Sequence, residues 1–150
     1  HMWIARRARD KATYPGELDN LVAGGQPIGI GPWDNLIKEC GEEAAIPPEI
    51  AAKAIAIGAI SYVVEGPDGL KPDTMFNYDL ELPEDFEPRN TDGEVDAFYL
   101  LPIERVAAIV RDTTEFKFNC NLVIIDFLIR HGLIGPEHPD YLALVAGLHR

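Results

Sequence analysis

The chain has 150 residues, the length of one domain with a hydrophobic core of ordinary size. It is 47% hydrophobic and carries a formal net charge of −12, which argues against general binding of nucleic acids and of anionic membranes. An acidic protein can still bind a phosphorylated small molecule where metal ions and a few basic residues line the cleft. No signal peptide and no bilayer-length apolar run is visible, so we expect a cytoplasmic protein.

The N-terminal part of the chain is expected to form two strands around a loop. His1 and Met2 look like the remnant of a cloning site, and a strand is expected at residues 3–8. A loop follows at 10–16, and a second strand at 18–22 is closed by Gly24 and Gly25. Because a core strand rarely starts a natural protein, we expect residues 3–150 to be a single domain from the C-terminal part of a longer protein.

A helix is expected from Pro32, which suits a first helical turn, to Ala45. Apolar residues recur in it at helical spacing and form one stripe that we expect to be core: Trp33, Leu36, Ile37, Cys40 and Ala44. Cys40 and Cys120 both lie in apolar helical stretches, so we expect buried reduced thiols rather than a disulfide or a metal site. The pair Pro47-Pro48 ends the helix, and a helical turn follows at 48–53.

The remainder of the chain reads as strands followed by helices. Strands are expected at 54–65, 74–82 and 94–101, with a turn at 66–69 and a polar loop at 83–92. Helices are expected at 102–111, 119–131 and 139–148. No internal repeat or linker divides the chain. This order favours an α+β fold or an α/β/α sandwich over a simple doubly wound sheet.

Three glutamates crowd onto one arc of the first helix. Glu39, Glu42 and Glu43 lie at positions i, i+3 and i+4, which places them within roughly 100° of the helix surface. Like charges at this spacing repel one another. A divalent cation such as magnesium or manganese would relieve the repulsion, because hard cations prefer oxygen ligands. The arc borders the apolar stripe, so we expect it at the edge of a cleft, although a solvated acidic face has the same pattern.

The segment from Gly24 to Ile46 resembles the Nudix box, G-x5-E-x7-R-E-U-x-E-E-x-G-U, where U is aliphatic. Gly24 matches the first glycine, Ile46 matches the last aliphatic residue, and the three glutamates match the E-U-x-E-E core. Four positions depart from the pattern: Ile30 replaces the first glutamate, Lys38 the arginine, Cys40 an aliphatic residue and Ala45 the last glycine. The departures leave the metal-binding core intact.

Residues 14–25, 92–95 and 119–132 resemble one subgroup, the Nudix domain of thiamine-pyrophosphokinase-related proteins, in which it follows an N-terminal domain. The resemblance implies a Nudix-type α/β/α sandwich with a mixed β-sheet. It implies a magnesium-dependent pyrophosphohydrolase, with manganese as an alternative cofactor. The substrate would be a small nucleoside or cofactor diphosphate, including thiamine diphosphate and its oxidised derivatives. A homodimer would also fit the family.

The resemblance assigns Glu39, Glu42 and Glu43 as metal ligands, with Glu42 and Glu43 acting in catalysis. Glu94 starts a predicted strand where many members place a further carboxylate, so it is a candidate catalytic residue, as a ligand or as a general base. A plain loop carboxylate is the alternative. Lys38 is expected to pair with Glu42, its i+4 neighbour, rather than with substrate.

Basic residues near the box are the candidates for phosphate binding. Arg6, Arg7 and Lys11 form the nearest cluster, and arginine offers bidentate contacts to phosphate. Because side chains alternate along a strand, only one of the two arginines is expected to face the site. Asp19 and Asn20 are expected to form hydrogen bonds within a turn or loop, and a role in the cleft is the alternative.

Two other functions compete with hydrolysis. The substitutions at Ile30 and Lys38 suit a Nudix-fold module that binds a nucleotide or cofactor without cleaving it. An isomerase of isoprenyl diphosphate would need a cysteine–glutamate pair in the cleft, and Cys40 lies on the apolar stripe instead.

Overall fold

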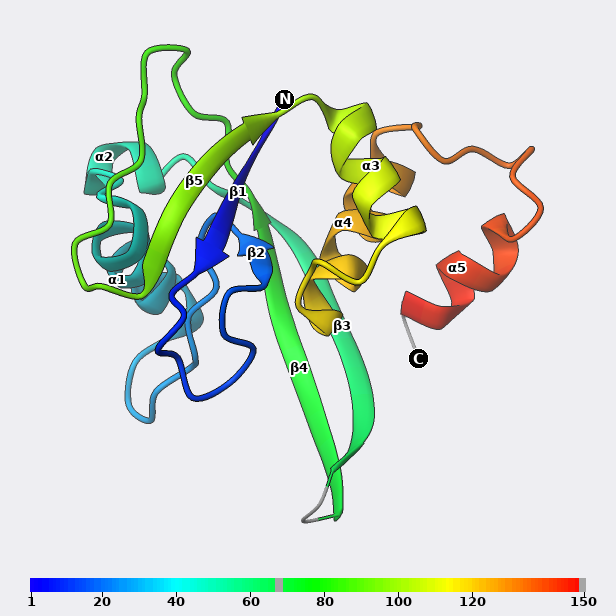
Figure 1. The fold of residues 1–150 in the computed structure, drawn as a ribbon, viewed down its shortest axis with the longest axis horizontal. Coiled ribbons are helices and arrows are strands. Elements are labelled where there is room, and N and C mark those ends of the chain that lie inside the picture. Colours follow the sequence, from blue (N-terminus) through cyan, green and yellow to red (C-terminus); the bar gives the residue numbers. More distant parts are fainter. Residues whose placement is uncertain (67–68, 149–150) are drawn as a thin grey trace.

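The computed structural model describes residues 1–66 and 69–148. In chain order its elements are β1 (Met2–Arg7), β2 (Leu18–Asn20), α1 (Pro32–Ala44), α2 (Pro48–Ala51), β3 (Ile55–Gly66), β4 (Gly69–Asp79), β5 (Val95–Leu101), α3 (Ile103–Asp112), α4 (Phe118–Arg130) and α5 (Tyr141–Leu148). Strands lie between α1 and α2 on one side and α3 and α4 on the other (Figure 1). The α+β sandwich expected from the sequence is therefore confirmed.

Two sheets form the middle layer. One has the order β2-β1-β5, with β1 antiparallel to both neighbours, and the other is the antiparallel β3–β4 hairpin. Within the described residues, parallel pairing enters through an isolated bridge between Leu18 and Phe116. The Lys117 N–H donates to the Leu18 carbonyl at 2.8 Å beside this bridge. The segment before α4 is therefore fixed against β2.

Two element boundaries differ from the expectations for a physical reason. β2 ends at Asn20, because Leu21 and Val22 turn away from the sheet and pack against the apolar face of α1. β4 spans Gly69–Asp79 rather than residues 74–82, and Pro72 fits because a two-stranded hairpin leaves one edge of each strand unpaired. Gly66 pairs with Gly69 as the turn predicts; residues 67 and 68 lie outside the described part of the chain.

Two hydrophobic clusters form the core. The larger joins β1 and β2 to α3 and α4, and its buried members are Ile4, Leu18, Val106, Ile109, Phe116, Cys120, Ile124 and Leu128. The smaller lies under α1 and consists of Cys40, Ala44, Ile46 and Ala51. Both cysteines are buried free thiols, as expected. The expectation for Trp33 was wrong: its side chain is 42% exposed, at the start of α1, where its ring meets the Tyr78 ring edge-on.

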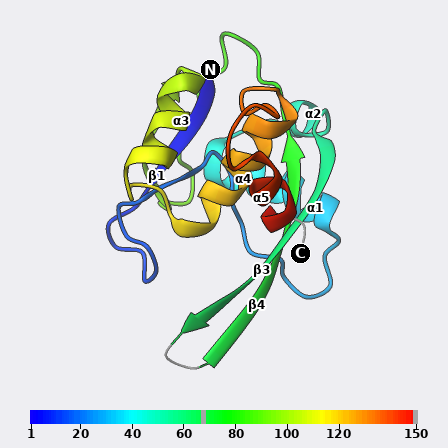
Figure 2. The same cartoon turned by 90° about the vertical axis from the view of Figure 1, so that its right-hand side faces the viewer.

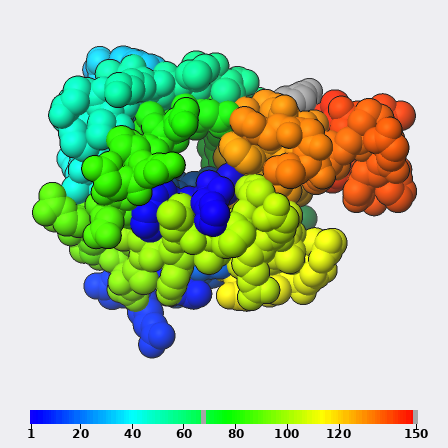
Figure 3. Space-filling model, turned by 90° about the horizontal axis from the view of Figure 1, so that it is seen from above, coloured from blue at the N-terminus to red at the C-terminus, as the bar shows by residue number. Residues whose placement is uncertain are grey.

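Peripheral elements extend from this core in different directions. The far part of the β3–β4 hairpin projects beyond the helices (Figures 1 and 2). α5 lies at the opposite end of the molecule from α1 and α2 (Figure 3). In the described ranges, every helix is too short or too polar to cross a membrane.

Candidate active site

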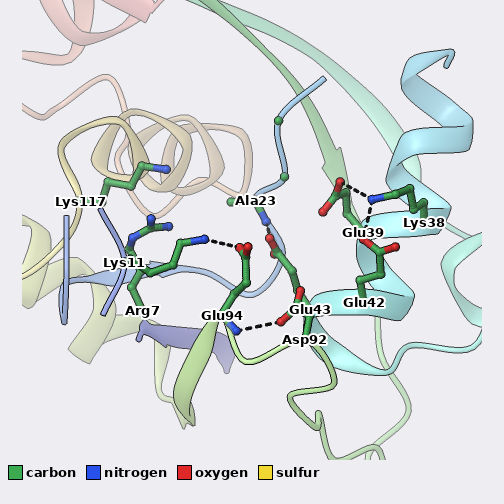
Figure 4. Close-up of a pocket in the computed structure, with 12 residues that line it drawn as sticks. Arg7, Lys11, Ala23, Lys38, Glu39, Glu42, Glu43, Asp92, Glu94 and Lys117 are labelled. Carbon is green, nitrogen blue, oxygen red and sulfur yellow. Dashed lines mark hydrogen bonds and ion pairs between the residues drawn. The ribbon is translucent and has the colours of Figure 1, made fainter. Parts of the chain in front are cut away.

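One cavity of about 380 Å³ collects carboxylates and cations from distant parts of the chain. Its carboxylates are Glu39, Glu42, Glu43, Asp92 and Glu94, and its basic residues are Arg7, Lys11, Lys38 and Lys117. In the view of Figure 4, the α1 glutamates lie on one side, Arg7, Lys11 and Lys117 on the other, and Glu94 between them. The arrangement gives opposite charges to the two walls of one cleft.

The α1 glutamates sit at the edge of the buried face of their helix. Cys40 and Ala44 are buried beneath them, the Glu39 and Glu43 side chains are largely covered, and Glu42 is half exposed. The apolar stripe therefore anchors α1 with its acidic arc toward the cavity rather than toward bulk solvent.

Glu43 is the most deeply placed of the three. Its carboxylate accepts a hydrogen bond of 2.7 Å from the Ala23 N–H. Burial raises the pKa of Glu43 to about 7; the hydrogen bond opposes this rise, and the negative charges of Glu39, Asp19 and Glu94 add to it. The charged form of Glu43 is thus disfavoured in this position, chiefly because the carboxylate is removed from water.

Gly24 allows the Glu39 carboxyl group to lie against the loop before α1. A Cβ atom on Gly24 would overlap that carboxyl group, whereas a Cβ on the next residue, Gly25, would meet open space. The first glycine of the box is therefore required for close approach of a side chain and not for an unusual backbone angle.

Lys38 neutralises part of the acidic arc. Its Nζ lies 2.5 Å from Glu42 Oε2 and 3.1 Å from Glu39 Oε1, so the expected pairing with Glu42 is confirmed. These two hydrogen bonds, that to Glu42 first, raise the pKa of Lys38.

No ready-made metal site is present in the described residues, because no three histidine, cysteine or acidic side chains converge closely enough. Lys38 donates hydrogen bonds to Glu39 and Glu42, and the Ala23 N–H donates one to Glu43. The donor set still fits magnesium or manganese, since every candidate ligand on the cavity is a carboxylate oxygen.

Glu94 is set by a tight turn just before β5. Asn90 shapes the turn by accepting from the Gly93 N–H at 2.8 Å and donating to the Val95 carbonyl at 2.6 Å. The Glu94 N–H donates to Asp92 at 2.9 Å, and the Glu94 side chain pairs with Lys11 at 2.5 Å. The turn thereby brings the predicted carboxylate to the same cavity as the glutamates of α1.

The two arginines of β1 point to different surroundings. Arg7 lines the cavity, whereas Arg6 bonds Tyr99 and the Gly16 carbonyl and lies 3.9 Å from Glu115. The suggestion that Arg6 contacts substrate therefore has no geometric support, because its guanidinium group is directed to Tyr99, Gly16 and Glu115 and away from the cavity. Of the three basic candidates, Arg7 and Lys11 reach the cleft.

Two charged residues that the sequence does not assign to the site lie at it: Lys117 lines the cavity, and Asp19 pairs with two of the lining residues, Arg7 and Lys117. Asp19 is 3% exposed on β2 and forms ion pairs with Arg7 at 2.8 Å and Lys117 at 3.5 Å. Asp19 lies in a strand and not in the expected turn, although its Oδ1 accepts the local hydrogen bond from the Asn20 N–H at 2.9 Å. The alternative, a role beside the cleft, fits its ion pairs. No local pattern reveals either residue, because the Leu18–Phe116 bridge that brings them together is a long-range contact.

Local contacts accommodate the departures from the box. Ile30 is 38% exposed, and its loop is held by Asn35, which donates to the Gly25 carbonyl at 3.0 Å, and by Gln26, which donates to the Ile30 carbonyl. Ala45 adopts φ 54°, the left-handed conformation for which glycine is favoured at the end of a helix. Cys40 is buried, and burial raises its pKa to about 11, so it offers no cleft nucleophile.

Comparisons with known proteins agree with this geometry. The chain is 56% identical to Nudix hydrolase 20, chloroplastic, and 56% identical to Nudix hydrolase 24, chloroplastic, both of Arabidopsis thaliana, over 95% of its own length in each case. It is 38% identical, over 99% of its length, to an uncharacterized protein of Saccharomyces cerevisiae. These likenesses support a Nudix domain. No protein-family model matches the chain.

The likeness covers only part of each relative. The chain spans 38% and 39% of the lengths of the two Arabidopsis proteins and 47% of the yeast protein. A crystal structure of a protein from Deinococcus radiodurans matches 81% of this chain and 71% of its own with a TM-score of 0.58; its sequence identity of 19% makes this a likeness of fold alone.

Proposed function

We propose that this chain is a Nudix domain that hydrolyses the diphosphate linkage of a small molecule with the help of magnesium or manganese. One observation carries the proposal: Glu39, Glu42 and Glu43 line the same cavity as Arg7 and Lys11. A diphosphate needs both groups, because the carboxylates bind a divalent cation and the basic side chains bind phosphate oxygens. The two named Nudix hydrolases among the relatives support the same activity.

The three box glutamates would hold the cation, with Glu42 and Glu43 closest to the chemistry. When bound, magnesium supplies positive charge for the phosphate oxygens and lowers the pKa of water. Glu94 is our candidate for the general base, since its turn holds it on the same cavity as the ligands. Arg7 and Lys11 would orient the diphosphate by charge.

The finer substrate assignment is thiamine diphosphate or one of its oxidised derivatives. Its support is the resemblance of residues 14–25, 92–95 and 119–132 to the Nudix domain of thiamine-pyrophosphokinase-related proteins. Hydrolysis would give the corresponding monophosphate and inorganic phosphate. A cytoplasmic location remains a prediction, since the names of both Arabidopsis relatives place those proteins in the chloroplast.

A second function, ligand binding without turnover, is favoured by one observation. Lys38 forms ion pairs with Glu39 and Glu42, which are two of the three ligands that a catalytic cation would need. If diphosphate binding leaves these ion pairs closed, the cleft holds a cofactor and does not cleave it.

A panel of diphosphates separates the two functions. Phosphate release would be measured with magnesium for thiamine diphosphate, its oxidised derivatives and several nucleoside diphosphates, with Glu42→Gln as the control. Hydrolysis predicts steady release by the wild-type chain and loss of release in the variant. Thermal stabilisation by a diphosphate without release would favour the binding module, and equal release by the variant would refute the assigned site.

A further inference from the structure

Three basic side chains face the acidic helix across the cavity, but they differ in how much of their charge is already used. All three nitrogens of the Arg7 guanidinium group already donate hydrogen bonds within the protein. Nε donates to the Tyr14 carbonyl at 3.1 Å, Nη2 to the Thr13 carbonyl at 3.0 Å, and Nη1 to Asp19 at 2.8 Å. These contacts pin the loop that follows β1. The first role of Arg7 is therefore architectural.

Lys11 is also occupied. Its Nζ lies 2.5 Å from Glu94 Oε2, so a phosphate group that binds Lys11 must compete with a carboxylate of the same site. Lys11 and Glu94 together contribute no net charge to this wall. A diphosphate that Arg7 and Lys11 orient therefore needs a further positive charge on this wall.

Lys117 is the least strongly paired of the three basic side chains. Among the described residues, its side chain has one charged partner, Asp19, at the longer distance of 3.5 Å. Its Nζ has three donor hydrogens, and its side chain, 17% exposed, lines the cavity. The Lys117 N–H donates to the Leu18 carbonyl, and this hydrogen bond fixes the backbone from which the Lys117 side chain extends.

Asp19 is built to hold this lysine. Its Oδ1 accepts from the Cys120 thiol at 2.7 Å and from the Asn20 N–H at 2.9 Å, while its Oδ2 faces Arg7 and Lys117. The carboxylate is thus fixed on one side and pairs with the two cations on the other. Arg7 and Lys117 carry two positive charges against the one negative charge of Asp19, which leaves one surplus positive charge at the cavity wall.

We propose that Lys117 binds a phosphate group of the substrate and that Asp19 is the positioning residue that directs it. The proposal rests on the proposed function, since it places a diphosphate between Lys117 and the glutamates of α1. A lysine in this place binds phosphate oxygens as a point charge. It also adds positive charge to the wall opposite the carboxylates of α1, in a chain whose net charge is −12.

The test measures binding of methylenediphosphonate, a diphosphate that cannot be hydrolysed, by isothermal titration with magnesium present. Lys117→Ala should weaken its affinity by about tenfold or more, because a charge-assisted contact is lost. Lys117→Arg, which keeps the charge, should remain within about threefold of wild type. Lys53→Ala, the matched loss of an exposed lysine outside the cavity, should leave the affinity unchanged.

Two further measurements separate positioning from structure. Asp19→Asn should weaken methylenediphosphonate binding while Lys117 is still present, and circular dichroism establishes that the variant is folded. Should it not fold, Lys117→Ala and Lys117→Arg carry the test alone. With a hydrolysed diphosphate, Lys117→Ala should raise KM by about tenfold and change kcat by less than about threefold, the pattern of lost ground-state binding.

The outcomes distinguish this inference from the proposed function. Wild-type affinity in Lys117→Ala, or no measurable binding by the wild-type chain, would overturn the inference. A fall in kcat with KM and probe affinity unchanged would overturn it as well. Binding through Lys117 in a chain that hydrolyses no diphosphate would support the inference and refute hydrolysis.

Discussion

The Glu43 carboxylate accepts a 2.7 Å hydrogen bond from the Ala23 N–H, which ties the acidic helix to the loop before Gly24. Glutamine at position 43 keeps an oxygen acceptor for this bond but removes the buried charge. We predict that Glu43→Gln melts at or above the wild-type temperature in metal-free buffer, because burial disfavours the charge and Glu39, Asp19 and Glu94 repel it as well.

The same substitution should abolish function. Losing a cation ligand removes transition-state charge stabilisation of several kcal/mol, so we expect hydrolysis to fall by about a hundredfold or more. Thermal melting and phosphate release measure the two effects. Glu49→Gln, at an exposed position on α2, is the control and should change neither. A Glu43→Gln variant with wild-type turnover would remove Glu43 from the catalytic set.

The neighbouring glycines Gly24 and Gly25 provide a matched pair of variants. A Cβ on Gly24 would push the flexible Glu39 side chain aside, whereas a Cβ on Gly25 meets nothing. Gly24→Ala should therefore reduce manganese affinity and turnover with little change in melting temperature, and Gly25→Ala should resemble wild type. Manganese titration followed by electron paramagnetic resonance makes the comparison. Equal affinity in both variants would contradict a role for the Glu39 position.

Lys38 competes with a cation for Glu39 and Glu42, according to its two ion pairs. We predict that Lys38→Met binds manganese more tightly, by roughly two- to fivefold, because exposed ion pairs are individually weak. Lys38→Arg restores the arginine of the Nudix box and should stay within about twofold of wild type. Weaker binding in Lys38→Met would mean that the lysine organises the ligands and does not compete for them.

Ala45 holds the left-handed conformation at the end of α1, with φ 54°. Glycine adopts this conformation without the steric cost of a Cβ atom, so Ala45→Gly should stabilise the fold by about 0.5–1 kcal/mol. Ala44→Gly, one residue earlier and fully buried within the helix, should destabilise it by about 1 kcal/mol or more. Urea unfolding measures both free energies. Destabilisation by both substitutions would contradict the conformation of Ala45.

The sequence could predict α1 and the direction of its acidic arc because both depend on local spacing. Cys40 and Ala44 fall on the buried side of the helix, and the glutamates beside them reach the cavity, as the 3.6-residue period requires. The pairing of Lys38 with Glu42 follows from the same geometry. Trp33 has the right spacing for the core, but it stands at the first turn, beyond the reach of the packed cluster.

The sequence could not predict contacts that depend on how distant segments meet. Lys117 reaches the cleft only through the parallel bridge between Leu18 and Phe116, and a single bridge leaves no periodic pattern. Aspartate is common in turns, and nothing near Asp19 in the sequence indicates that it is buried. Its buried position depends on contacts with Arg7, Lys117 and Cys120, which are distant in the sequence. Alternation along the strand indicated that one of Arg6 and Arg7 faces the site, but not which one; their side-chain partners and the irregular pairing between them with β5 give that place to Arg7.

The central claim is that Glu39, Glu42 and Glu43 support hydrolysis and not only binding. The most direct test is turnover of thiamine diphosphate and nucleoside diphosphates in water enriched in oxygen-18, with products analysed by mass spectrometry. We predict that the wild-type chain with magnesium forms many products per chain, each hydrolysis adding one oxygen-18 atom. EDTA and Glu42→Gln should abolish this incorporation. Magnesium-dependent binding of a diphosphate by the wild-type chain without labelled product would contradict the claim.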